Sequence, residues 1–110
     1  MINVYVEKSG ERIRSFSMDG HADFAEHGQD IVCAGASAVS FGSVNAIMSL
    51  TGVEPLIEQS ADGGYLSCVI PDGLPDETDM KVQLLLSSMV ISLQTIERDY
   101  RDFIKITFKK

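Results

Sequence analysis

Proline, tryptophan and cysteine are all scarce in this sequence: its 110 residues include three prolines, two cysteines and no tryptophan. Two cysteines are too few for the disulfide framework that stabilises small secreted domains. Hydrophobic residues make up 45% of the chain and charged residues 23%, a balance that excludes intrinsic disorder. The length is that of one domain, so residues 1–110 are predicted to fold as a single unit.

Signals for secretion or membrane insertion are also lacking. Residues 1–9 contain Glu7 and Lys8 before the apolar core of a signal peptide can form. Residues 31–53 carry no charge, but four serines, an asparagine, a threonine and three glycines in this stretch disfavour insertion into a membrane. We therefore interpret the stretch as a buried helix, and we expect a cytoplasmic protein with reduced thiols and no membrane partner.

Basic residues are missing from most of the chain. Nine Lys and Arg stand against sixteen Asp and Glu, which gives a net charge of −7. Between Arg14 and Lys81 there is no basic residue, whereas eleven acidic residues occur there: Asp19, Asp23, Glu26, Asp30, Glu54, Glu58, Asp62, Asp72, Asp76, Glu77 and Asp79. A nucleic-acid-binding surface needs the opposite sign, so we exclude direct binding to nucleic acid. Such a chain attracts a basic polypeptide, although solubility alone also accounts for the asymmetry.

Apolar residues alternate in five short segments and recur every three or four residues in two longer ones. Period-two alternation predicts strands over residues 2–7, 12–18, 56–60, 65–70 and 103–108. Helical spacing predicts one helix from Val32 to about Leu50 and another from about Asp76 to Tyr100. We therefore predict an α+β fold of order β-β-α-β-β-α-β, with a mixed or largely antiparallel five-stranded sheet covered by the two helices.

The two predicted helices differ in polarity. The first is uncharged and rich in small residues, which predicts burial on most of its sides. The second has an apolar seam that packs on one side and that Leu85 and Ile91 are expected to widen. The members of this seam are Val82, Leu86, Met89, Leu93, Ile96 and Tyr100.

A polar segment from Asp19 to Asp30 separates the second strand from the first helix. It contains His21, His27 and two glycines, and its apolar residues have no regular period. Loops of this length in a compact domain are often functional, and we expect this one to be a mobile catalytic loop that acts as a lid. Asp30 is expected to cap the helix that follows.

The two cysteines occupy different kinds of position. Cys68 lies on the apolar face of a predicted strand, which is typical of an inert buried residue. Cys33 lies in the first turn of a helix, where unpaired N–H groups and the positive end of the dipole are expected to lower the pKa of its thiol. The loop can bring His21 to the sulfur, which supplies the nucleophile and the base of acyl transfer. The backbone N–H groups around Cys33 are candidates for an oxyanion hole.

Other interpretations of the same residues stay open. A structural histidine beside an inert cysteine is compatible with this spacing. A zinc site could use His21, His27, Asp30 and Cys33, but no Cys-x-x-Cys pair supports it. A dithiol redox motif is weaker, because Cys33 has no neighbouring cysteine. We therefore expect neither a metal nor another cofactor.

Two short blocks resemble a known family signature. Gly20-His21-Ala22 is followed by Gly-Gln-Asp-Ile-Val-Cys-Ala at residues 28–34 and then by Ser37-Ala38. The blocks, their spacing, the chain length and the order of elements resemble the ribosomal-processing cysteine proteases of the Prp family over essentially the whole chain. The resemblance implies a small, cytoplasmic, homodimeric endopeptidase that removes a short N-terminal extension from a large-subunit ribosomal protein.

By this resemblance His21 is the general base and Cys33 the nucleophile, while Asp30, Ser37 and Gly20 match further positions of the motif. In physical terms, Asp30 either caps the helix or orients His21, and Ser37 bonds either near the site or to its own helix. The acidic stretch suits a basic ribosomal substrate. Two other functions stay open: a non-catalytic ribosome-associated adaptor of the same fold, and a thiol sensor or hydrolase that acts on a small molecule.

Overall fold

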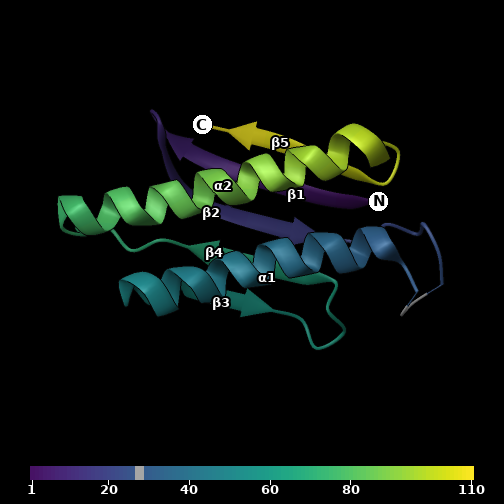
Figure 1. Cartoon of the computed structure of the whole chain (residues 1–110), viewed down its shortest axis with the longest axis horizontal. Coiled ribbons are helices and arrows are strands. Elements are labelled where there is room, and N and C mark those ends of the chain that lie inside the picture. Colours follow the sequence, from purple (N-terminus) through teal and green to yellow (C-terminus); the bar gives the residue numbers. More distant parts are fainter. Residues whose placement is uncertain (27–28) are drawn as a thin grey trace.

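Five strands and two helices follow one another in the predicted order in the computed structural model, which describes residues 1–26 and 29–110 (Figure 1). The strands are β1 (Ile2–Ser9), β2 (Arg12–Asp19), β3 (Leu56–Gln59), β4 (Tyr65–Val69) and β5 (Ile104–Lys109). The helices are α1 (Ile31–Thr51) and α2 (Asp76–Tyr100). All seven predicted elements are confirmed, with small differences at their ends.

The strands form one mixed sheet in the order β3-β4-β2-β1-β5. β1 pairs parallel with β5 and antiparallel with β2, and the β2–β4 and β3–β4 pairs are antiparallel. The parallel pair depends on α2, which carries the chain back across the sheet between β4 and β5. Figure 1 shows α1 and α2 side by side on the same face of the sheet. The predicted fold class is therefore confirmed.

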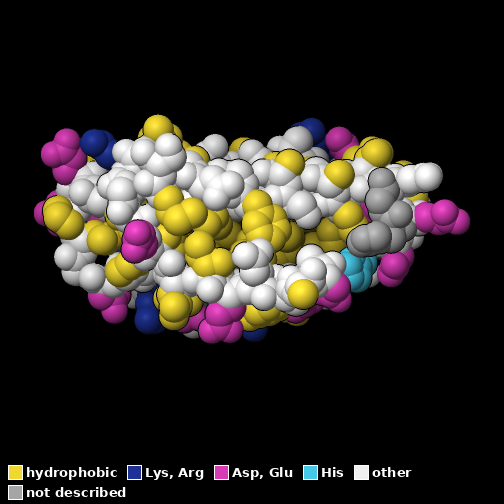
Figure 2. Space-filling model, turned by 90° about the horizontal axis from the view of Figure 1, so that it is seen from below, with side chains coloured by type: hydrophobic (Ala, Val, Ile, Leu, Met, Phe, Trp, Pro, Cys, Tyr) yellow, Lys and Arg dark blue, Asp and Glu magenta, His cyan; other side chains and the backbone are white. Residues whose placement is uncertain are grey.

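The hydrophobic core lies between the sheet and the two helices. Ile2, Val4 and Val6 alternate with more exposed residues along β1, so that one face of this strand is buried. Figure 2 views the edge formed by α1 and β3, where apolar side chains gather in a hollow between the helices and the sheet. Phe41 of α1 and Ile57 of β3 are partly buried apolar residues packed against the core.

Helix α1 is bounded by a strong cap at each end. Asp30 caps its N-terminus, and Gly52, at a φ of 76°, ends it with a bond from its N–H to the Met48 carbonyl.

The buried residues of α1 form one stripe: Val32, Ala36, Ser40, Val44 and Ile47. The prediction of burial on most sides is therefore wrong in the single chain, because a helix in one layer above a sheet buries only the side that faces it. Judged only by its length and apolar composition, α1 is also the one helix of the described residues that is long enough and apolar enough to cross a membrane.

Helix α2 buries most of its predicted seam. Val82, Leu86, Met89 and Leu93 are buried, and Leu85 packs against the core from a partly buried position. Ile91, by contrast, is 64% exposed, so the prediction that it widens the seam is wrong. Residues two apart in a helix point to nearly opposite sides, and the adjacent seam residue Met89 already faces the core.

The β3–β4 hairpin places Cys68 inside the protein. Its side chain is fully buried on the inner face of β4. Burial raises the pKa of this thiol to about 11, because a thiolate loses its hydration there. The interpretation of Cys68 as an inert core residue is confirmed.

Candidate active site

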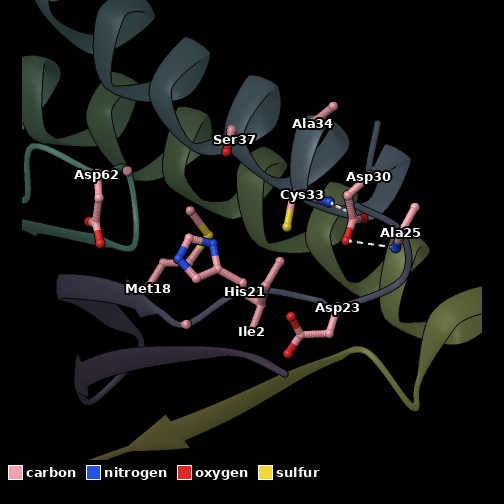
Figure 3. Close-up of a pocket in the computed structure, with 12 residues that line it drawn as sticks. Ile2, Met18, His21, Asp23, Ala25, Asp30, Cys33, Ala34, Ser37 and Asp62 are labelled. Carbon is pink, nitrogen blue, oxygen red and sulfur yellow. Dashed lines mark hydrogen bonds between the residues drawn. The ribbon is translucent and has the colours of Figure 1, made fainter. Parts of the chain in front are cut away.

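A pocket of about 440 Å³ lies where the end of β2, the start of α1 and the β3–β4 hairpin meet (Figure 3). The five residues singled out from the sequence, Gly20, His21, Asp30, Cys33 and Ser37, all line it. The pocket also has lining residues that the sequence analysis did not single out: Ile2, Met18, Asp23, Ala25, Ala34, Asp62 and Gly63. The structure therefore brings the predicted site residues together.

Gly20 sets the position of His21 at the end of β2. Its φ of +88° lies in the left-handed region, and a Cβ atom here would collide with the carbonyl oxygen of Met1. Its N–H donates to the carbonyl of Gly64, 3.0 Å away in the hairpin. Only glycine combines this backbone conformation with so close a contact. The chain therefore leaves β2 sharply and carries His21 into the pocket.

The Cys33 thiol lies in the first turn of α1 and is partly exposed in the pocket. Burial raises the pKa of this thiol; the N–H of Ala22, 3.2 Å from Sγ, lowers it, and the negative charge of Asp30 raises it. The expected lowering of this pKa at the helix N-terminus is therefore wrong for this conformation. The carboxylate that caps the helix offsets the positive end of the dipole, so deprotonation of Cys33 requires a base.

Asp30 is the cap that the sequence predicts, and it does more than cap. One carboxylate oxygen accepts hydrogen bonds from the N–H groups of Val32 and Cys33, both at 3.0 Å. The other accepts from Phe24 at 2.9 Å and Ala25 at 3.3 Å. Burial alone would raise the pKa of Asp30, but these four bonds together lower it. Asp30 therefore joins the loop to the helix that carries the thiol.

The backbone N–H groups expected to form an oxyanion hole are already used. Those of Val32 and Cys33 donate to the Asp30 carboxylate, and that of Ala34 donates to the Asp30 carbonyl at 3.0 Å. That expectation is therefore wrong for these three groups. The N–H of Ala22 is the one that points at the thiol sulfur. It comes from the loop rather than from the helix, so helical position could not have identified it.

The imidazole of His21 lies at the hairpin side of the pocket. A Cβ atom built on Gly64 would lie 3.1 Å from Nε2 of His21, so this nitrogen faces the hairpin backbone. Figure 3 shows the ring between the Asp62 carboxylate on one side and the Cys33 thiol on the other. Ser37, one turn beyond Cys33, lines the same pocket. A base and a nucleophile therefore share one cavity, as acyl transfer requires.

The loop that carries His21 is packed against the end of α2. The ring of Phe24 makes edge-to-face contacts with Tyr100 and Phe103, at centroid separations of 5.5 and 5.0 Å. His27, which the alternative zinc site would use, lies outside the described residues, as does Gly28. Within residues 1–26 and 29–110, no group of three or more potential metal ligands is found.

The chain is similar in sequence to a known protein family. Residues 1–105 match the family model described as "Cysteine protease Prp". The chain is 51% identical over 108 residues to the ribosomal processing cysteine protease Prp of Bacillus subtilis (strain 168), covering 97% of this chain and 96% of that protein. It is 46% identical over 110 residues to the protein of the same name from Staphylococcus aureus (strain Mu50), covering 99% and 100%.

Solved structures agree with these sequence matches. A crystal structure of the essential ribosomal processing protease Prp from S. aureus, in complex with a covalently linked product peptide, superposes with a TM-score of 0.90 at 46% identity. A second structure of that protease, in complex with a substrate peptide, gives a TM-score of 0.83 at 44% identity. Both comparisons cover 99% of this chain and 100% of the other.

Proposed function

Because the chain belongs to the Prp family of cysteine proteases, we propose that it processes a ribosomal protein, with His21 as the general base and Cys33 as the nucleophile. The bond that it cleaves releases a short N-terminal extension from a large-subunit ribosomal protein, in the cytoplasm, where ribosomes mature. The observation that carries this proposal is the pocket that His21 and Cys33 share at the N-terminus of α1.

The reaction begins with proton transfer from Cys33 to His21. Because burial and Asp30 raise the pKa of the free thiol, the thiolate forms as an ion pair with the imidazolium rather than alone. The sulfur then attacks the carbonyl carbon of the scissile bond, and the imidazolium gives its proton to the departing amine. Water, deprotonated by His21, hydrolyses the thioester and releases the acid. The Ala22 N–H, 3.2 Å from Sγ, stabilises negative charge on the thiolate.

The charge of the pocket selects the substrate. Asp23, Asp30 and Asp62 line it, and no Lys or Arg occurs between Arg14 and Lys81 to oppose them. An acidic site of this kind attracts a basic polypeptide such as a ribosomal protein. Apolar walls from Ile2 and Met18 complement an uncharged side chain near the scissile bond.

The supporting residues act through the backbone and through the loop. Asp30 holds the loop against α1 and thereby keeps the Ala22 N–H near the thiol, Gly20 directs His21 into the pocket, and Ser37 offers a hydroxyl one turn from the thiol. The loop over residues 19–30 acts as a lid that opens to admit the peptide. Opening separates Phe24 from the aromatic rings at the end of α2.

The protein acts as a homodimer. The sheet covers one side of each helix, and large apolar side chains remain exposed on the others. They include Ile31 and Leu50 of α1 and Met80, Leu84 and Ile91 of α2, each at least 58% exposed. Exposed large apolar side chains on both helices are consistent with a protein–protein interface, and a second copy of the chain offers a matching surface.

The decisive experiment incubates the chain with the extended ribosomal protein and follows its shortening. Cys33→Ala and His21→Ala are each expected to lower the rate by about 10⁴-fold or more while the protein stays folded. Cys68→Ala is the matched control, because its thiol is buried away from the pocket, and its rate is expected to stay close to wild type. Near-wild-type turnover in either the Cys33 or the His21 variant contradicts the proposed dyad.

Two alternatives predict other results. A ribosome-associated adaptor would not shorten the protein, and Cys33 would not react with an alkylating agent far faster than Cys68. A small-molecule thiol hydrolase would cleave an ester in preference to the peptide.

A further inference from the structure

Asp62 is an acidic residue of the pocket that the sequence identified only as one of eleven acidic residues between Arg14 and Lys81. Its Oδ1 accepts hydrogen bonds from the Ser60 hydroxyl at 2.7 Å and from the Gly64 N–H at 3.0 Å. These bonds fix the carboxylate relative to the tip of the β3–β4 hairpin, because both donors belong to that hairpin. The side chain is exposed to solvent yet lines the same pocket as His21 and Cys33.

The hairpin brings this carboxylate next to the imidazole. A Cβ atom built on Gly64 would lie 3.1 Å from Nε2 of His21 and 3.3 Å from Oδ1 of Asp62. Both side chains therefore approach the same glycine, whose lack of a side chain leaves room for both. The bond from the Gly20 N–H to the Gly64 carbonyl ties the residue before His21 to the same hairpin.

The other titratable groups of the pocket are engaged by other partners or lie on another side of the imidazole. The carboxylate of Asp30 is engaged by four backbone N–H groups. Asp23 pairs with the N-terminal amino group at 3.9 Å, and Cys33 lies on the other side of the ring (Figure 3). The bonds from Ser60 and Gly64 lower the pKa of Asp62, and the charge of His21 lowers it further. Asp62 is thus ionised beside the imidazole.

We propose that Asp62 is a positioning residue: its carboxylate, fixed at the hairpin on the Nε2 side of His21, favours the protonated imidazole that pairs with the Cys33 thiolate. The two ring nitrogens of a histidine have distinct roles, set by the partner of each. An anion at the Nε2 side favours the imidazolium and therefore the thiolate–imidazolium pair. This inference rests on the proposed dyad and adds a third member from a different part of the chain.

The test is Asp62→Asn, which keeps an oxygen for the bonds from Ser60 and Gly64 but removes the charge. With a short neutral peptide as substrate, kcat is expected to fall about 2- to 5-fold with little change in KM, because the Asp62 carboxylate is exposed to solvent. The alkaline limb of the pH profile of kcat/KM is expected to move to lower pH, because the imidazolium loses its anion. Asp72→Asn is the matched control, since it makes the same change of charge in the connector between β4 and α2, outside this pocket.

A second variant addresses position rather than charge. Gly64→Ala places a methyl group about where Nε2 of His21 approaches, and it is expected to lower kcat in the same way while Asp62 remains. Thermal unfolding shows whether each variant is folded. If the carboxylate served only to attract the substrate, Asp62→Asn would change KM for a basic peptide. The pH profile measured with the neutral peptide would then stay the same. That result overturns the proposal.

Alkylation of Cys33 by iodoacetamide separates this inference from the proposed function, because it needs no substrate. Near neutral pH the rate is expected to fall several-fold in Asp62→Asn and to be unchanged in Asp72→Asn. If the wild type fails to cleave the ribosomal protein but shows this difference, the proposed function is wrong and the role of Asp62 stands. If the wild type cleaves it and Asp62→Asn matches the wild type in kcat, pH profile and alkylation, the role of Asp62 is refuted.

Discussion

Replacing Asp30 by asparagine tests the contact that joins the loop to the nucleophile's helix. The carboxylate is 6% exposed and accepts four backbone hydrogen bonds of 2.9–3.3 Å. Asparagine has nearly the same shape but only one acceptor oxygen, so two of the four N–H groups lose their partner and face an amide N–H instead. A hydrogen bond to a charged group contributes about 1.5–3 kcal/mol, and the loss of two predicts a destabilisation of about 3–6 kcal/mol.

Urea unfolding at fixed protein concentration measures this loss directly. For a domain of this size, about 3–6 kcal/mol also lowers Tm by roughly 12–25 °C. Asp72→Asn provides the control, because Asp72 is exposed and surface substitutions usually stay within about 0.5 kcal/mol.

The pH dependence supplies a second check. The folded protein holds the pKa of Asp30 below its ordinary value. The Asp30 carboxylate therefore stabilises the fold fully at any pH above the pKa that Asp30 has in the unfolded chain, about 3.9. That contribution is lost as the pH falls through the lower, folded-state pKa. The difference between wild type and Asp30→Asn is therefore expected to be constant near neutral pH and to shrink below about pH 4. Equal stabilities at neutral pH, or a difference that persists unchanged in acid, would refute the role assigned to the four bonds.

Assembly, steering and backbone geometry each give a separate prediction. Light scattering at micromolar concentration is expected to give the mass of a homodimer, and a monomer mass contradicts the proposed pairing through α1 and α2. The Debye length falls from about 30 to 8 Å as the ionic strength rises from about 0.01 to 0.15 M. This rise is expected to lower kcat/KM for the basic substrate only. An equal salt dependence for a neutral peptide would mean that the acidic residues serve solubility rather than attraction of the substrate. Gly20→Ala is expected to lower Tm and activity together, since its Cβ meets the Met1 carbonyl, and an unchanged Tm would contradict this.

The elements of the fold were predictable from the sequence because their signals are local. Alternation along β1 and the seam of α2 reflect which face of a strand or helix is buried, and a short window contains that pattern. Asp30 was identified as a cap for the same reason, since a cap and its donors lie within one turn. The site residues were found less by spacing than by the resemblance of two short blocks to a family signature.

The organisation of the site depends on contacts between segments that are distant in the sequence. The pKa of the Cys33 thiol depends above all on burial, which its position in the helix does not reveal, and the expected direction was wrong. Ile91 is as apolar as the residues of the seam of α2, but the single sheet covers only one side of this helix, and Ile91 lies on another side. Asp62 is 41 positions from His21 in the chain, and in the sequence it is one of eleven acidic residues with nothing that links it to the histidine. The two meet because β4 pairs with β2, and strand pairing between distant segments is a property of the whole fold.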